Sequence, residues 1–218
     1  MKPETAAAAI VERFLLKPGQ TVSRITRRGE VVRVRTDRTG WLVNTDHRTN
    51  TVGSYAYTLC EVRPDLAADP PSVPRGFAIL PGDRIFDLTD PEEFKSFCIQ
   101  AGTSIASPGL INLLARYQAR QRPAVAILDP GSVSFWLSPD RLEEIPGFTY
   151  PEVTHRRNGS MTLTFCSLHI ESDSPVHRPR IGLARWEVKL EIDGRPDWST
   201  RPLAQAGVDR RAGARWES

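Results

Sequence analysis

The stretch "ARWEVKLEI", residues 184–192, alternates strictly between apolar and charged side chains. Its apolar positions are Trp186, Val188, Leu190 and Ile192. Its charged positions are Arg185, Glu187, Lys189 and Glu191. Successive side chains of a strand point to opposite faces of a sheet, so this pattern predicts a strand with one buried and one exposed face. A register slip of one residue would bury the charges, which fixes the expected orientation.

The charged row has two interpretations. A charged face of mixed sign is typical of a solvent-facing antiparallel strand. The spacing Glu187-x-Lys189 is also the one that metal-dependent nucleases of the ExK type place on a strand, with Asp140 or Asp173 as the second carboxylate. Because Pro139 and Asp140 are better explained as a helix start, we expect the solvated face.

Further strands and helices surround this stretch. The hairpin signal Asn158-Gly159 joins the predicted strands 148–156 and 160–172, and apolar periodicity predicts helices at 4–16, 91–100 and 108–121. Short strands are also expected at 123–128 and 133–137. Consecutive hairpins at both ends with helices between them predict an α+β fold, mainly antiparallel sheet, with an N-terminal helix and a helical middle segment.

The domain organisation follows from composition. Residues 1–62 hold the N-terminal helix and Arg-rich strands, including "TVSRIT", "EVVRVRT" and "GWLVNT", with a polar loop at 46–53. Residues 63–76 form a proline-rich connection, and residues 77–194 form a mixed α+β part. Residues 195–218 form a tail with Arg and Trp residues, for which we expect a loosely structured terminus rather than a nucleic-acid-binding tail.

Three proline-led segments predict helix starts with side-chain caps. Asp90, Ser107 and Ser138 each precede a proline. Proline is favoured at the first helical position, and Asp and Ser oxygens accept hydrogen bonds from the free backbone N–H groups of the first turn. We therefore interpret these residues as helix caps rather than as ligands of a cation or phosphate.

Composition limits the class of protein. The 218 residues are 39% hydrophobic and 25% charged, which is ordinary for a globular protein. Apolar runs such as "AAAAIV" are far shorter than the roughly 18 residues of a membrane span, and the N-terminus does not read as a signal peptide. Cys60, Cys98 and Cys166 have no CxxC spacing, so free buried thiols and a cytoplasmic location are expected.

The positive charge is concentrated early in the chain. Residues 21–48 contain seven arginines against three acidic residues. If Arg28-Gly29 is a two-residue turn, Ile25 pairs with Val32 and Arg24 lies opposite Arg33. Arginines opposite each other repel unless an anion lies over them, which suggests a polyanionic partner. A three-residue turn would instead scatter the arginines over both faces, so the register remains open.

Other chemical motifs are absent from the sequence. The histidines, among them His155 and His169, have no zinc-ligand spacing, and a register through Asn158-Gly159 would place His155 opposite Thr162. No GxSxG, P-loop or GxGxxG pattern is present. We expect neither a metal nor a cofactor.

The leading hypothesis is a non-catalytic nucleic-acid-binding or assembly subunit that meets phosphates of DNA or RNA through an Arg-rich hairpin. Its candidate residues are Arg24, Arg33, Arg35, Arg38, Trp41 and Arg48. The alternatives are the ExK nuclease and a protein-binding module that uses the N-terminal helix or the C-terminal tail. We expect a binding protein rather than an enzyme.

Overall fold

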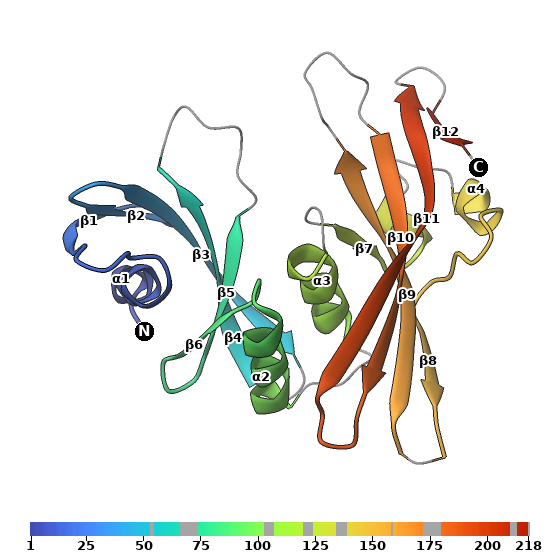
Figure 1. Ribbon diagram of the computed structural model, residues 1–218, viewed down its shortest axis with the longest axis horizontal. Helices are drawn as coiled ribbons and strands as arrows, with labels where there is room; N and C mark the ends of the chain where they lie inside the picture. The colour runs from blue at the N-terminus through green and yellow to red at the C-terminus, as the bar shows by residue number, and fades with distance from the viewer. Residues whose placement is uncertain are drawn as a thin grey trace. The chain divides into compact units, whose positions relative to one another are not determined.

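The computed structural model describes residues 1–52, 55–65, 74–102, 107–119, 124–133, 139–157, 159–171, 180–209 and 213–217. The chain divides into two compact units, Met1–Gly102 and Thr103–Ser218, each built around antiparallel strands (Figure 1). The N-terminal helix and the helices in the middle of the chain confirm the predicted α+β fold.

The first unit contains an antiparallel sheet in which each strand pairs with the next along the chain. Its strands are β1 (Val22–Arg28), β2 (Val31–Thr36), β3 (Gly40–Val52), β4 (Tyr55–Pro64), β5 (Arg75–Leu80) and β6 (Arg84–Asp87). The polar loop predicted at 46–53 is wrong, because β3 continues to Val52 with an irregular register between Asp46 and Asn50. The proline-rich connection predicted at 63–76 joins β4 to β5, which pair with each other.

Helix α1 (Pro3–Phe14) lies across β1, β2 and β3 in Figure 1. Its Ala7, Ile10 and Val11 are fully buried, as are Val32 and Val34 of β2. These residues belong to one apolar cluster, on which Phe14 and Leu15 also pack. The apolar stripe of the N-terminal helix therefore docks on its own unit, as its helical spacing predicts.

Helix α2 (Pro91–Ala101) begins as the sequence predicts. The Asp90 carboxylate accepts hydrogen bonds from the backbone N–H groups of Glu92 and Glu93, both at 2.9 Å. Two of the unpaired donors of the first turn are thereby satisfied. The helix ends at Gly102, whose left-handed backbone (φ 58°) lets its N–H bond back to the last turn.

The second unit contains another antiparallel sheet, in the order β12 (Gly213–Glu217), β11 (Pro196–Asp209), β10 (Arg180–Leu190), β9 (Met161–Glu171) and β7 (Val125–Ile127). Strand β8 (Glu152–His155) also pairs with β9. The predicted β8–β9 register is wrong by one residue, because His155 lies opposite Met161 rather than Thr162. The Arg156 N–H donates to the Ser160 carbonyl, so three residues lie in the turn between them. Gly159, with a left-handed backbone (φ 83°), accommodates this longer turn.

Shorter helices complete the second unit: α3 (Pro108–Tyr117), a 3-10 turn η1 (Pro130–Val133) and α4 (Pro139–Glu143). Ser107 occupies the N-cap position of α3, but its side chain makes no capping hydrogen bond, which corrects the prediction. Ser138 and most of the strand predicted at 133–137 lie outside the described residues.

Strand β10 confirms the alternation that its sequence predicts up to Leu190. Trp186, Val188 and Leu190 are at most 4% exposed, and the Trp186 ring stacks on Phe165 with centroids 5.4 Å apart. The Trp186 Nε1–H donates to the Ser167 hydroxyl at 2.8 Å. Ile192 is 79% exposed, contrary to expectation. The reason is that β10 ends at Leu190, and Glu191 bonds to Arg195 across a turn that includes Ile192.

The C-terminal tail also differs from expectation. Residues 196–209 form β11, which pairs with β10 along most of its length, and β12 returns antiparallel to β11. A loosely structured terminus was predicted because the ends of a chain are commonly poorly ordered unless they are tied down. Here strand pairing with the long strand β10 holds the segment in place.

Candidate nucleic-acid interface

The β1–β2 hairpin has neither of the two registers considered from the sequence. Arg28 pairs with Val31, so Gly29 and Glu30 form the turn, and Arg24 lies opposite Arg35 instead of Arg33. Gly29 has φ 63°, and glycine at the first turn position with a positive φ is typical of a type II′ hairpin turn. The correction changes the partner of Arg24 but retains a pair of opposed arginines.

This register separates the hairpin into two faces. Val32 and Val34 point to the core beneath α1, and their partners Arg27 and Ile25 lie on the same side of the sheet but are exposed. The arginines on the other side continue across β2, β3 and β4, since Arg33 pairs with Leu42 and Leu42 pairs with Arg63. We call this surface the arginine face; its exposed cations are Arg24, Arg28, Arg33, Arg35 and Arg63.

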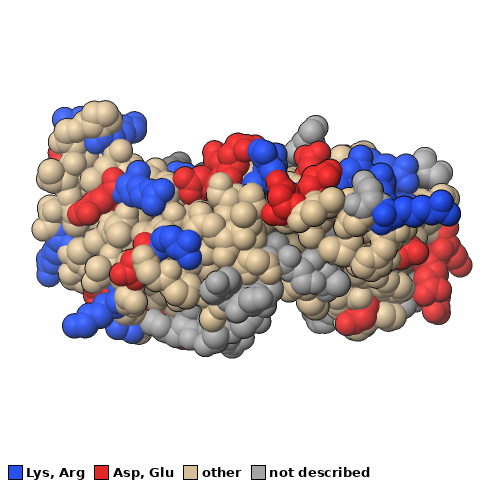
Figure 2. All heavy atoms as spheres, turned by 90° about the horizontal axis from the view of Figure 1, so that it is seen from below, with Lys and Arg blue, Asp and Glu red and all other residues tan. Residues whose placement is uncertain are grey.

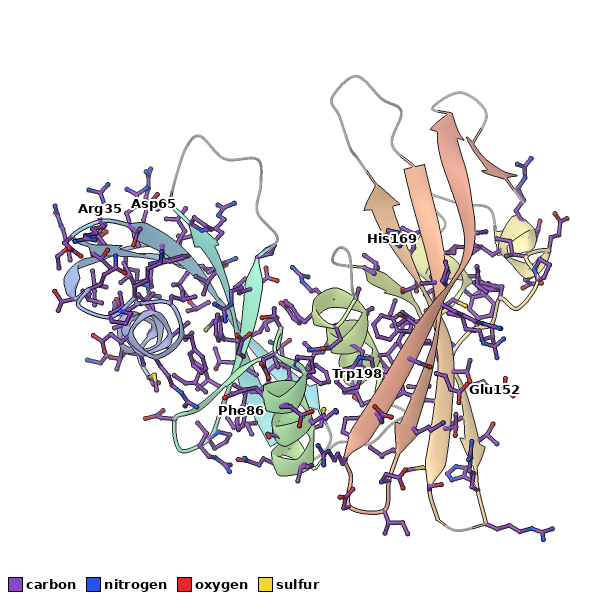
Figure 3. All side chains as sticks on the ribbon, viewed as in Figure 1. Arg35, Asp65, Phe86, Glu152, His169 and Trp198 are labelled. Carbon is purple, nitrogen blue, oxygen red and sulfur yellow. The ribbon has the colours of Figure 1, made fainter. Side chains whose placement is uncertain are left out.

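Asp65 is an acidic residue that contacts the arginine face. Its Oδ2 lies 2.9 Å from Nε of Arg33 and 4.0 Å from Nε of Arg35. Figure 3 shows Asp65 beside Arg35. The Asp65 side chain is 14% exposed, and its backbone N–H donates to the Gly40 carbonyl, which fixes it at the start of β3. The carboxylate therefore reduces the repulsion between these two arginines.

The other cations of the arginine face have no such partner. Arg24, Arg28 and Arg63 form no ion pair within the part of the chain that the structure describes. Among the described residues, Asp65 and Glu61 of β4 are the carboxylates on this side of the sheet, so the five guanidinium groups leave the face with a positive excess. By contrast, Lys and Arg are interspersed with Asp and Glu over the side of the molecule seen in Figure 2.

The remaining predicted binding residues lie elsewhere. Trp41 pairs with Val34 and packs on the core beneath α1, so it lies on the opposite face from Arg33. Arg38 is in the β2–β3 turn, 79% exposed and 3.6 Å from the Asp37 carboxylate. Arg48 belongs to β3, but its side chain lies outside the described residues. The structure thus brings Arg24, Arg33 and Arg35 together without Trp41.

Three members of the arginine face were not predicted. Arg28 was assigned to the turn, and Arg63 and Asp65 were assigned to the proline-rich connection. The signal that could have identified them is strand pairing: once β4 is extended to Pro64, Arg63 falls opposite Leu42. Register across strands, rather than spacing along one strand, assembles this surface.

The charged row of β10 is a solvated face in the structure. Glu187 and Lys189 are 51% and 52% exposed at their side chains and lie 3.9 Å apart. The residues opposite Glu187 are Thr164 and Ser199, so no directly paired residue is a carboxylate. Asp140 lies in the first turn of α4, and Asp173 lies outside the described residues.

Histidine and cysteine side chains do not form a metal centre in the described residues, where no group of three potential ligands comes together. His155 is the last residue of β8, next to the β8–β9 turn, whereas His169 packs over Gly182 of β10. The three cysteines are buried free thiols, as predicted. Burial raises the pKa of Cys60 to about 12, so this thiol stays protonated at neutral pH.

The fold and this face define an α+β protein with an arginine-rich exposed sheet surface. The chain is 27% identical over 111 residues to the DNA repair protein RecO of Prosthecochloris aestuarii, a match that covers 51% of this chain and 36% of that protein. The chain thus aligns with little more than a third of that relative. No protein-family model matches the chain, and no solved structure does.

Among the described residues, none of the helices combines the length and the apolar character needed to cross a bilayer.

Proposed function

We propose that this protein binds nucleic acid through the arginine face. The observation that carries the proposal is the opposition of Arg24 and Arg35 on the exposed side of a sheet whose other side is packed against α1. Two guanidinium groups at directly paired positions repel, and an anion placed over them removes that cost. A phosphate backbone supplies such anions at regular spacing.

The geometry suits phosphate better than a single carboxylate. Guanidinium groups donate two parallel hydrogen bonds to phosphate oxygens, which adds orientation to charge attraction. The Asp65 carboxylate contacts Arg33 and Arg35 on their Nε side, so the terminal nitrogens are not part of these ion pairs. Asp65 would thereby orient both groups while their outer edges meet the ligand.

The likeness to a DNA repair protein supports this class of ligand. The relative is named for DNA repair, and the match covers about half of the present chain. Phosphate contacts fix position on a strand and carry no sequence information. We therefore infer binding with little sequence preference, in which Leu42, the half-buried residue between Arg33 and Arg63, offers apolar contact.

Fluorescence polarisation with labelled single-stranded DNA, duplex DNA and RNA at several salt concentrations tests the proposal. We expect binding at low salt that weakens steeply as salt rises, because each neutralised phosphate releases counterions. Changing Arg24, Arg33 and Arg35 together to Ser should reduce the slope of log K against log salt by about 2 to 3.

A variant with the same loss of charge elsewhere is the control. Arg13, Arg84 and Arg157 are exposed and lie outside the arginine face, so the triple Ser variant at these positions should retain most of the slope. If the two triple variants lost the same amount of salt slope, net charge and not the arginine face would govern binding. No binding to any of the three nucleic acids at low salt would refute the proposed function.

A further inference from the structure

The second unit contains another pair of opposed arginines, on a surface that the proposed function does not use. Arg185 of β10 lies directly opposite Arg201 of β11. Both belong to the face of the sheet that also carries Glu187 and Lys189. Like charges at directly paired positions are unfavourable in an isolated sheet, so their arrangement calls for an explanation.

The two guanidinium groups converge on one point. A Cβ atom added at Gly147 would lie 3.3 Å from Nη2 of Arg201 and 3.7 Å from Nη1 of Arg185. These two nitrogens are therefore within about 7 Å of each other. Gly147 has φ 83°, and glycine at this position also keeps the space between the arginines free of a side chain.

The local contacts hold Arg185 in place and leave Arg201 available. Arg185 Nη1 donates to the Gly147 carbonyl at 3.0 Å, which orients one guanidinium group. The nearest acid along the strand, Glu187, pairs with Lys189 instead. Within the described residues, neither Arg185 nor Arg201 forms an ion pair with a carboxylate.

The guanidinium groups of Arg185 and Arg201 both act on the pKa of Cys166. Cys166 lies opposite Arg185 on β9 and is fully buried. Burial raises the pKa of this thiol, while the Thr149 N–H and the positive charges of Arg185 and Arg201 act in the opposite direction.

We propose that Arg185, Arg201 and the space left by Gly147 form a phosphate-binding site in the second unit. One tetrahedral oxyanion placed between the two groups can accept charge-assisted hydrogen bonds of about 2.8 Å from both. The ligand class is a phosphate group, either free or as a terminal or bridging phosphate of a nucleotide. This site is separate from the arginine face, and it does not depend on the proposed function.

The test is a titration of the full chain with inorganic phosphate, followed by NMR of the arginine Nε–H signals at constant ionic strength. We expect saturable shifts at Arg185 and Arg201, and chloride at the same ionic strength should not produce them. Arg201→Gln is the main variant, because the Arg201 side chain makes no hydrogen bond within the described residues, whereas Arg185 also donates to the Gly147 carbonyl. This change should weaken phosphate binding at least about tenfold, as expected for loss of one charge-assisted contact.

Arg157→Gln is the matched control, since Arg157 is a single exposed arginine of the same unit. It should leave the titration unchanged. A second titration with a dinucleotide that has only a bridging phosphodiester identifies the source of the phosphate. Saturable binding of either probe that Arg201→Gln weakens supports the site. Two results would overturn it: no saturable shift with either probe, or an equal effect of Arg157→Gln and Arg201→Gln, which means an adventitious ion only.

The triple variant in which Arg24, Arg33 and Arg35 are changed to Ser tests whether the phosphate site is independent of the arginine face. It should abolish most nucleic-acid binding and leave the phosphate titration of Arg185 and Arg201 intact. Loss of the phosphate titration in that variant would contradict an independent site in the second unit.

Discussion

The outer faces of β2 and β10 have the same sequence pattern and different surfaces. In both strands, charged residues alternate with buried ones: Arg33 and Arg35 flank Val34, and Glu187 and Lys189 flank Val188. On β10 the signs alternate, and Glu187 pairs with Lys189 within the strand. On β2 both charges are positive, and neighbouring strands add Arg24 and Arg63 to the same side.

This difference shows what period-two alternation does and does not determine. Alternation places charges on the exposed side of a sheet, because burial of an unpaired charge is costly. It does not determine whether those charges cancel within a strand or add across strands. That depends on register, which brings residues distant in sequence, such as Arg24 and Arg35, to paired positions.

The largest expected effect comes from the buried side of β10. Trp186→Ala should lower the free energy of unfolding by roughly 3 to 5 kcal/mol, through lost burial and the cavity that remains. The change also removes the Nε1–H group that donates a hydrogen bond to the Ser167 hydroxyl. Denaturant titration measures the loss.

Glu187→Ala on the exposed side of the same strand is the comparison. It should change the free energy of unfolding by no more than about 0.5 kcal/mol, the usual size for a surface substitution. If Glu187→Ala destabilised the protein as much as Trp186→Ala, the charged row would have a structural role that its 51% exposure does not suggest.

An intermediate effect on stability is expected from removal of the N-cap side chain of α2, but not of α3. Asp90→Ala removes a carboxylate that accepts two backbone hydrogen bonds, so it should destabilise the protein by roughly 0.5 to 2 kcal/mol. Ser107→Ala should stay within about 0.5 kcal/mol, because the Ser107 side chain makes no capping bond. Thermal unfolding of both variants is the measurement, and equal losses would contradict the capping geometry.

A small effect on stability is expected at the arginine face itself. Asp65→Asn keeps the size of the side chain and removes its charge. It should cost about 0.2 to 1 kcal/mol of stability, since Arg33 and Arg35 are half exposed. Nucleic-acid binding should become tighter by about fivefold at low salt, which corresponds to the roughly 1 kcal/mol between unit charges about 4 Å apart in water.

Polarisation titrations of the wild type and Asp65→Asn, side by side, measure this change. Asp37→Asn is a suitable control, because Asp37 is also acidic and lies in the adjoining turn, beside Arg38 and away from Arg33. Weaker binding by Asp65→Asn would show that orientation of the two arginines matters more than the charge that Asp65 neutralises.

Much of the fold was predictable because its signals are local. The stripe of Ala7, Ile10 and Val11 predicted the docking of α1, and the Asp90-Pro91 start predicted the cap of α2. The alternation around Trp186 predicted the buried side of β10. Each of these signals lies within a single element, where the helical or strand period directly relates sequence to burial.

The two register errors lie at turns, where a single glycine sets the register. Gly29 was placed at the second turn position, whereas it occupies the first with a positive φ. Gly159 was read as part of a two-residue turn, whereas Arg156 and Ser160 leave three residues between them. Glycine is compatible with several turn types, so sequence alone did not select among them.

The candidate site was predicted in part for the same reason. Arg24, Arg33 and Arg35 were identified, but Trp41 was assigned to them from sequence proximity alone and lies on the core side. Arg63 and Asp65 come from β4 and its end, more than twenty residues after Arg35 along the chain. Contacts of that sequence separation depend on tertiary pairing, which no local pattern encodes.

Asp65 also has a consequence for selectivity among anions. It is part of the chain, so it competes for Arg33 and Arg35 at a high effective concentration that does not change when the protein is diluted. A small monovalent anion makes few contacts with which to offset this competition. A strand of phosphates engages several cations of the face at once, and Arg24, Arg28 and Arg63 have no ion pair to lose among the described residues. Under the proposed function, the tethered carboxylate would therefore disfavour isolated ions more than a multivalent ligand.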